Sequence, residues 1–242
     1  MLTERSKQVR RGAFKLAKAN GGYHFGGSFS CAEILIALYD KVLRHNDVFI
    51  LSKGHGCWCW YVLLREKGLH PKLEGHPYRD PANGVYWTTG SLGHGFPAAV
   101  GVALARKIQK RVGRVFVLMG DGEVQEGTTW ESLLLARKHN LDNLFVIVDA
   151  NNCQGSCNLC LPSHFIGQVA KDCRWWVNSV ADGHDIDFLA SVFQRDYPSG
   201  QPVLTAAQTI KGKGVSFMES RPEWHAKFPN AEQEKQMMEE LS

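Results

Sequence analysis

The sequence predicts an α/β fold of three layers, in which a central, mainly parallel sheet is flanked by helices. Two short, uninterrupted apolar runs, residues 115–119 and 144–148, are typical of strands buried on both faces, as in a parallel sheet. A helical pattern over residues 128–139 lies between them, so strand, helix and strand form one crossover unit. The 242 residues, 44% of them hydrophobic, are enough to bury the core of one domain covering residues 1–242.

Three helices are expected before this unit. The first covers residues 3–19, and the second follows Ser30, whose hydroxyl is expected to cap it. The third covers residues 97–110, because apolar residues recur there at helical spacing. Its apolar face would consist of Ala98, Val102, Ala105 and Ile108.

Two further elements are expected after the crossover unit. Residues 203–210 form a third apolar run and are predicted as a strand. The polar, mostly acidic segment 231–242 is predicted as a surface helix or tail.

Composition excludes several classes of protein. No apolar run approaches the roughly 20 residues that a membrane helix needs, and the basic start lacks the apolar segment of a signal peptide, so a cytoplasmic location is expected. The net charge of +4 is small, and the Lys and Arg residues are scattered rather than clustered, which disfavours nucleic-acid binding. Neither a membrane nor a nucleic acid is therefore expected as a partner.

The cysteines allow one alternative. Seven cysteines in a cytosolic chain are expected to be mostly free thiols. Cys153, Cys157 and Cys160 have the C-x3-C-x2-C spacing of radical enzymes that bind an iron–sulfur cluster. The context disfavours this interpretation, because too little sequence follows the run to build the barrel of such enzymes.

Polar residues follow both apolar runs of the crossover unit. Gly120, Asp121 and Gly122 end the first, and Asn151 and Asn152 end the second. Each group alone is typical of a turn. Ligands of parallel sheets, however, bind outside the carboxyl ends of the strands, and a carboxylate with an amide oxygen suits Mg²⁺ or Ca²⁺. The pair therefore predicts a cation site, with glycines that let an anion approach the backbone.

The spacing of these residues resembles the thiamine diphosphate signature, which begins with Gly-Asp-Gly and ends in Asn about thirty residues later. Further motifs resemble transketolase and run in that family's order over most of the chain. They are Leu51-Ser52-Lys53-Gly54-His55-Gly56, Thr89-Gly90-Ser91-Leu92-Gly93, Gly120-Asp121-Gly122-Glu123-Val124-Gln125-Glu126-Gly127, Asp182-Gly183-His184-Asp185 and Lys211-Gly212-Lys213-Gly214 through Trp224-His225. The chain resembles the amino-terminal, diphosphate-binding part of that enzyme, as found where it is split between two genes.

The resemblance implies the thiamine-diphosphate-binding fold and a set of site residues. The cation, Mg²⁺ or Ca²⁺, would be bound by Asp121, Asn151 and the backbone carbonyl of Cys153. Contacts to thiamine diphosphate would come from His55, Gly90, Ser91, Leu92, Asp121, Gly122, Asn151 and His225. Substrate handling would fall to His24, His76 and His225, and Glu126 would lie at the subunit interface, linked to the second active site. The remaining histidines, His184 among them, are expected to be structural or superficial.

The resemblance also implies a partner. Transketolases place the glutamate that activates the cofactor in a pyrimidine-binding domain, for which 242 residues leave no room. The chain would therefore be inactive alone. It would act in a heterotetramer with a C-terminal transketolase subunit and transfer a two-carbon ketol unit from a ketose or ketose phosphate to an aldehyde. Tyr23, His94 and Ala226 depart from the family pattern, which favours an altered substrate in a specialised biosynthetic pathway.

Three alternatives share parts of this pattern. A deoxyxylulose-phosphate synthase fragment or the alpha subunit of a 2-oxo acid dehydrogenase would have the same cation site. Glu126 and the Trp224-His225 segment favour transketolase over both. A non-catalytic module that only binds the cofactor is the third alternative.

Overall fold

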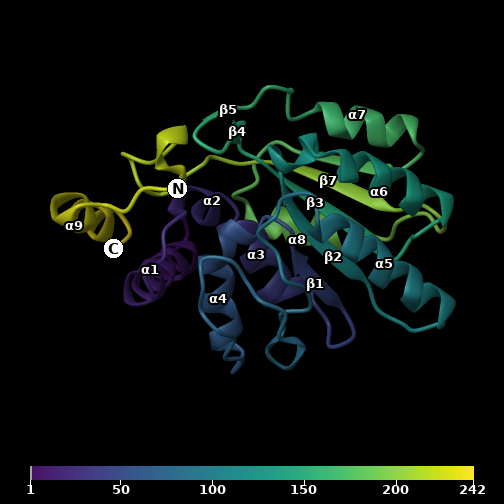
Figure 1. The fold of residues 1–242 in the computed structure, drawn as a ribbon, viewed down its shortest axis with the longest axis horizontal. Coiled ribbons are helices and arrows are strands. Elements are labelled where there is room, and N and C mark those ends of the chain that lie inside the picture. The colour runs from purple at the N-terminus through teal and green to yellow at the C-terminus, as the bar shows by residue number, and fades with distance from the viewer. Residues whose placement is uncertain (1) are drawn as a thin grey trace.

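The fold is built on one five-stranded sheet, and Figure 1 shows how its helices surround it. The structure is a computed structural model that describes residues 2–242. The strand order is β1-β2-β3-β7-β6, and every neighbouring pair is parallel. The strands of this sheet are β1 (Val48–Leu51), β2 (Val115–Gly120), β3 (Leu144–Ala150), β6 (Trp176–Val180) and β7 (Val203–Gln208). A short antiparallel hairpin, β4 (Cys153–Gln154) with β5 (Cys157–Asn158), follows β3.

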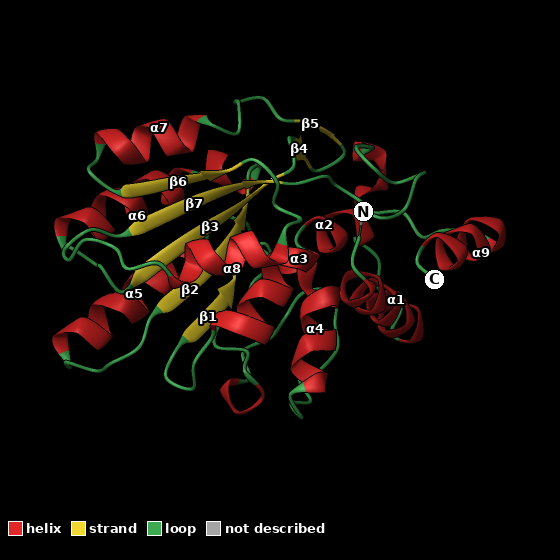
Figure 2. Ribbon diagram, turned by 180° about the vertical axis from the view of Figure 1, so that it is seen from behind, coloured by secondary structure: helices red, strands yellow, loops and turns green. Residues whose placement is uncertain are grey.

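Helices cover both faces of the sheet. One face packs on α1 (Glu4–Ala19), α2 (Phe25–Ser30), α3 (Ala32–Ile36), α4 (Cys57–Glu66) and α8 (Ile186–Gln194), and the other packs on α5 (Gly95–Ile108), α6 (Gly127–Lys138) and α7 (Phe165–Asp172). Figure 2 shows α8 in front of the sheet. Alternate residues of β2 enter the two cores, Phe116 and Leu118 on one face and Val117 and Met119 on the other. The expected three-layer α/β fold is thus confirmed.

The predicted elements of the crossover unit are confirmed. β2 and β3 lie side by side in the middle of the sheet, and α6 connects them. The first helix begins one residue after Thr3, whose hydroxyl accepts a hydrogen bond from the Ser6 amide at 3.1 Å. The predicted third strand corresponds to β7. No helix within residues 2–242 is long and apolar enough to cross a membrane.

The expectation for Ser30 is wrong. Ser30 is the last residue of α2, and its hydroxyl caps no helix. It donates instead to the carboxylate of Asp149 at 2.5 Å, and its oxygen lies 3.1 Å from the carbonyl of Gly27. The helix expected after Ser30 is divided into α3 and a π-helical turn, Ala37–Val42.

The expected apolar face of α5 is also wrong. The buried residues of this helix are Gly95, Phe96, Ala99, Val100 and Ala103. Of the predicted face, Ala98 and Val102 are half-buried and Val102 packs against the core, but Ala105 and Ile108 are exposed, Ile108 at 72%. Small and apolar residues occur on both sides of this helix, so periodicity alone could not identify the side that packs on the sheet.

The C-terminal helix α9 (Ala231–Glu240) is amphipathic, and one of its faces is packed. Met237 and the following Leu241 are fully buried and join the core on the α1 side of the sheet. The Lys18 ammonium of α1 lies 2.6 Å from the Glu234 carboxylate of α9, and Figure 1 shows the two helices as neighbours. The segment is therefore a helix, as predicted, but one that is anchored in the core.

Candidate active site

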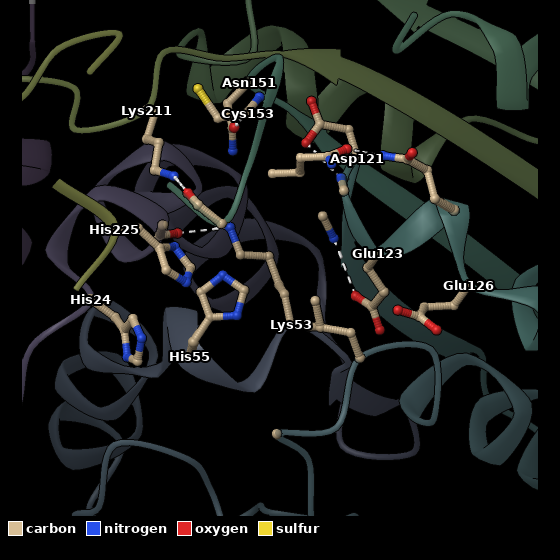
Figure 3. A pocket seen from close by; sticks show the side chains of 18 of the residues that line it. His24, Lys53, His55, Asp121, Glu123, Glu126, Asn151, Cys153, Lys211 and His225 are labelled. Carbon is tan, nitrogen blue, oxygen red and sulfur yellow. Dashed lines mark hydrogen bonds between the residues drawn. The ribbon is translucent and has the colours of Figure 1, made fainter. Parts of the chain in front are cut away.

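A cavity of about 450 Å³ opens at the carboxyl ends of β2 and β3, and Figure 3 shows the side chains around it. Its lining includes the predicted site residues His24, His55, His76, Gly90, Leu92, Asp121, Gly122, Glu126, Asn151, Cys153 and His225. Ser91 is the predicted residue that does not line the cavity. Its side chain is exposed and lies 3.3 Å from Nδ1 of His94.

Asp121 follows β2 and is almost completely buried, with 3% of its surface exposed. Its Oδ1 accepts from the amide of Gly122 at 2.9 Å, and its Oδ2 accepts from the amide of Asn152 at 2.5 Å. Burial, and then the nearby Asp149 carboxylate, raise the pKa of Asp121 to about 7. A carboxylate held in such surroundings is costly unless a cation shares the site.

Asn151 follows β3, next to the end of β2. Its Oδ1 accepts from the amide of Cys153 at 3.1 Å, and the cavity is lined by all three residues Asp121, Asn151 and Cys153. A carboxylate, an amide oxygen and a backbone carbonyl are hard oxygen donors, which suit Mg²⁺ or Ca²⁺ when phosphate oxygens and water complete the shell. The donor set therefore fits the implied cation.

The iron–sulfur interpretation finds no support in the geometry. Among residues 2–242, no three His, Cys, Asp or Glu side chains gather closely enough to hold a metal ion. Cys157 and Cys160 are exposed on the β5 side of the hairpin, and the Cys157 thiol donates to the carbonyl of Gln154 at 3.1 Å. All seven cysteines are free, as expected.

Gly122 allows the hairpin to lie close to the end of β2. A Cβ at this position would come within 2.8 Å of the Cβ of Gln154. Since real Cβ atoms are essentially never this close, any side chain here would move the hairpin. Gly122 thus sets how closely the hairpin approaches Asp121, to whose carboxylate the Gly122 amide donates.

Imidazoles form the other wall of the cavity, on the left in Figure 3. The ring of His24 lies 5.6 Å from that of His55, 4.9 Å from that of His225 and 5.7 Å from that of His76. Burial lowers the pKa of His24 to about 4, helped by the positive charge that His225 and His76 would carry, and burial with Lys211 lowers the pKa of His225 to about 4. Burial also holds the pKa of His55 well below its ordinary value. These three rings are neutral at pH 7, so each offers one donor and one acceptor.

His24 combines an unusual backbone with an unpaired nitrogen. Its φ of 68° lies in the left-handed region, which is costly for a residue other than glycine. Its Nδ1 is buried and has no hydrogen-bond partner among residues 2–242. A buried polar atom without a partner, at the wall of a cavity, is typical of a group that awaits a ligand.

Two lysines that were not predicted as site residues from the sequence, Lys53 and Lys211, also line the cavity. Lys53 precedes the 3₁₀ turn of His55, is 1% exposed and forms an ion pair with Asp149. The Lys211 ammonium, which follows β7, donates to the carbonyl of Gly155 in the hairpin at 2.7 Å. Both stand in motifs quoted above, and a lysine set among glycines and apolar residues is the signal that could have identified them. The Lys211 ammonium, at the edge of the proposed cation site, suits a diphosphate.

Glu123 was also not singled out from the sequence. It is 1% exposed, and its carboxylate accepts from the amides of Gly93 at 2.9 Å and Gly120 at 3.3 Å and from the Ser52 hydroxyl. Burial raises its pKa. This carboxyl group therefore ties the turn from Gly90 to Gly93 to the end of β2.

The departures from the family pattern lie at the imidazole wall and on the surface. The exposed ring of Tyr23 packs against that of His24, with 4.2 Å between centroids, and the indole of Trp58 donates to the Tyr23 carbonyl at 2.8 Å.

Trp58 and Trp60 are fully buried. The aromatic cluster Cys57-Trp58-Cys59-Trp60, which the sequence assigns to the core or to a partner interface rather than to the substrate, is therefore part of the core. His184 is structural, since it bridges Glu33 and the amide of Ile210.

Comparisons with known proteins identify the family of the chain. Residues 6–241 match the family described as "Transketolase, thiamine diphosphate binding domain". The chain is 36% identical over 271 residues to one subunit of the apulose-4-phosphate transketolase of Actinobacillus succinogenes, covering 99% of this chain and 95% of that protein. It is 36% identical over 222 residues to the 6-deoxy-6-sulfo-D-fructose transketolase subunit SqwG of Clostridium sp., covering 82% and 80%.

Whole transketolases are matched over a part of comparable size. Human transketolase is 31% identical over 264 residues, which cover 99% of this chain but 42% of the human protein. Transketolase from Leishmania mexicana superimposes with a TM-score of 0.89 at 24% identity, covering 100% of this chain and 41% of that one. Transketolase from Campylobacter jejuni gives 0.82 at 26% identity, with 98% and 42% covered. The chain thus spans about two fifths of the length of these enzymes.

The matches confirm the resemblance that the motifs indicated. The family model covers nearly the whole chain, and the relatives of similar length are single subunits of transketolases made from separate chains. The chain therefore belongs to the transketolase family of transferases, in which it corresponds to the thiamine diphosphate binding subunit of the split enzymes.

Proposed function

We propose that this chain binds thiamine diphosphate through a divalent cation and that, with a partner chain, it transfers a two-carbon ketol unit from a ketose to an aldehyde. The observation that carries the proposal is the shared cavity. It brings a buried carboxylate and an amide oxygen, at the ends of neighbouring strands, to one side of a cluster of neutral imidazoles and buried lysines.

The cation, Mg²⁺ or Ca²⁺, would be held by Asp121, Asn151 and the carbonyl of Cys153. Lys211 lines the same side of the cavity and supplies positive charge to it, whereas the ammonium of Lys53 is already held by the Asp149 carboxylate and the Gly27 carbonyl. Lys211 would hold the diphosphate together with the cation. When bound there, thiamine diphosphate supplies the carbon nucleophile by which a carbon–carbon bond of the ketose is broken and remade.

The imidazoles would handle the sugar. The rings of His76 and His225 both lie within 6 Å of the His24 ring, and burial holds His24 and His225 neutral. A neutral imidazole can accept a hydrogen bond from one sugar hydroxyl and donate one to another, and the unpaired Nδ1 of His24 is free to make such a contact. His55 would orient the cofactor rather than the sugar.

The substrate proposed is a ketose or ketose phosphate, with an aldehyde acceptor. Relatives of similar length are named for apulose-4-phosphate and for 6-deoxy-6-sulfo-D-fructose, which are sugars with an anionic end. We extend only that shared chemistry to this chain. Tyr23, which packs on the ring of His24, supports a substrate different from those of central sugar metabolism.

A partner chain would carry the pyrimidine-binding domain and complete a two-plus-two heterotetramer. Large apolar side chains are exposed on α5 and α6, which pack side by side, and they include Ile108 at 72%, Leu134 at 59% and Leu135 at 47%. An apolar surface of this kind on two neighbouring helices supports an interface. Glu126, exposed at the start of α6 and at the edge of the cavity, would then face the partner.

The test is reconstitution. The chain is co-expressed with the product of the neighbouring gene, and the purified complex is assayed for ketose-to-aldehyde transfer with thiamine diphosphate and Mg²⁺. Activity of the complex, with none for either chain alone or for a complex carrying Asp121→Ala, supports the proposal. A complex that binds the cofactor but transfers nothing from any ketose would point to a non-catalytic binding module instead.

A further inference from the structure

We propose that Asp149, clamped by Lys53, is a positioning residue that fixes the side-chain amide of Asn151 with its oxygen toward the cation. This inference rests on the cation site proposed above and adds a second layer to it. Neither Lys53 nor Asp149 would touch the cation. Their role would be to determine that the oxygen of the Asn151 side-chain amide, rather than its nitrogen, faces the cation.

Asp149 is the penultimate residue of β3 and is fully buried. Its Oδ2 accepts from the Ser30 hydroxyl at 2.5 Å, from the Lys53 ammonium, and from Nδ2 of Asn151 at 3.2 Å. Its Oδ1 accepts from the Thr209 hydroxyl. Four donors from four separate segments therefore converge on one carboxylate at the end of the central strand.

These contacts allow the Asn151 amide only one orientation. Nδ2 faces two acceptors, the Asp149 carboxylate and the Ser30 oxygen at 3.4 Å, while Oδ1 faces a donor, the amide of Cys153 at 3.1 Å. If the amide turned over, its oxygen would face a carboxylate and its NH₂ would face an N–H group. Both contacts would become repulsive. The amide oxygen keeps a second lone pair, which is the one offered to the cation.

Lys53 is what allows a second carboxylate to sit so close to Asp121. Its ammonium is 1% exposed and also donates to the Gly27 carbonyl at 2.7 Å, so its position is set independently of Asp149. Burial lowers the pKa of Lys53, but Asp149 outweighs this and raises it. Lys53 is thus a permanent cation, and it offsets the charge of Asp149 in a site that must attract another cation.

Two explanations of Lys53 predict effects of opposite sign. If Lys53 influenced the site only by its charge, its removal would strengthen binding of a divalent cation, because a repulsive charge would be lost. If Lys53 acts by holding Asp149 and thereby Asn151, its removal would weaken binding. Loss of groups that orient metal ligands typically costs about 10- to 100-fold in metal affinity.

The first test is a titration of the full chain with Mn²⁺, without and then with thiamine diphosphate, with free Mn²⁺ followed by electron paramagnetic resonance. The sign for Lys53 is taken from the titration without thiamine diphosphate, in which its charge acts on the cation alone. We expect Lys53→Met to lower the affinity about tenfold or more, in line with other orienting groups. Ser30→Ala, which removes one contact to Asp149 and no charge, should lower it in the same direction by less. Ser6→Ala, at a buried serine of α1 that does not line the cavity, is the control and should change nothing.

Unfolding in urea without cation separates this effect from general damage. Ser30→Ala must remain folded while its Mn²⁺ affinity falls, which keeps the test valid even if Lys53→Met does not fold. Tighter Mn²⁺ binding by Lys53→Met, or unchanged affinity of Ser30→Ala, would overturn the proposal.

A second readout needs no cation at all. In nuclear magnetic resonance spectra of the full chain, the side-chain NH₂ group of Asn151 should exchange slowly with solvent, and Ser30→Ala should accelerate this exchange. Fast exchange in the unmodified chain would refute the positioning role. If exchange behaves as expected but Mn²⁺ does not bind, the proposed function loses its cation site while the fixed amide stands, so the two failures are distinguishable.

Discussion

Replacing Asp121 by Asn should make the cation-free chain more stable and at the same time remove its ability to bind the cation. Burial raises the pKa of Asp121 from its ordinary 3.8 to about 7. Ionising this group in the folded chain at pH 7 therefore costs about 4 kcal/mol relative to the unfolded chain. Asparagine carries no charge, so this cost disappears. The carboxylate, however, accepts two backbone hydrogen bonds, and the loss of one acceptor returns about 1–2 kcal/mol.

The net expectation at pH 7 is a gain of about 2–3 kcal/mol in the free energy of unfolding. The pH dependence of the free energy of unfolding provides a second test of the sign of this effect. Between about pH 4 and 7 the folded chain holds a proton on Asp121 that the unfolded chain has released, so the stability contributed by this group is lost as pH rises through that range. The Asp121→Asn variant should lack this loss.

The assay is urea unfolding at pH 5 and pH 7.5 without cation, repeated with thiamine diphosphate and Mg²⁺. At a hundredfold excess over the dissociation constant, ligand should stabilise the unmodified chain by about 2.7 kcal/mol and the variant not at all. Asp196→Asn, at an exposed carboxylate, is the control and should leave both measurements unchanged. A variant that is less stable than the unmodified chain at pH 7.5, or one still stabilised by ligand, would refute the reasoning.

Three further predictions concern other parts of the molecule. Burial would raise the pKa of Glu33, but the Arg10 guanidinium and the His184 imidazole together outweigh burial and lower it to about 2. Glu33→Gln should therefore cost about 3–5 kcal/mol in urea unfolding at pH 7, and an unchanged midpoint would contradict this. Gly122→Ala should displace Gln154 and weaken thiamine diphosphate binding in calorimetry, whereas equal affinity would show that the hairpin need not lie close. Leu134→Lys should prevent co-purification with the partner chain without changing thermal stability, and an intact complex would place the interface elsewhere.

The central strands of the sheet could be predicted from the sequence, but its edge strands, β1 and β6, could not. β2 and β3 are continuous apolar runs because both of their faces are buried, so composition alone identifies them. β6 lies at the edge of the sheet, and its residues are mostly exposed or half-buried, including Trp176 at 37%. Such a strand carries little apolar signal. β1 is buried but has only four residues, too few for a periodic pattern.

The candidate site divides in a similar way. Residues that would touch a ligand stand next to glycines or at strand ends, which makes positions such as Asp121 and Asn151 recognisable. Residues that hold them in place are recognisable only from burial. In the sequence Asp149 is the polar end of an apolar run and Ser30 resembles a helix cap, but the fold places one against the other at 2.5 Å. A contact across 119 positions in the chain leaves no local pattern.

The three proposed cation donors differ in how firmly the chain anchors them. Asp121 and Asn151 continue central strands whose ladder holds them in register. Cys153 instead opens a hairpin that contacts the rest of the site through the donations of Lys211 to Gly155 and of Gln125 to Gln154. We therefore expect exchange of the tethered cofactor to proceed by partial release, in which the hairpin moves away while the strand ends stay in place. The surface residues of that hairpin would then determine the residence time of the cofactor, and the strand ends that carry Asp121 and Asn151 would determine its affinity.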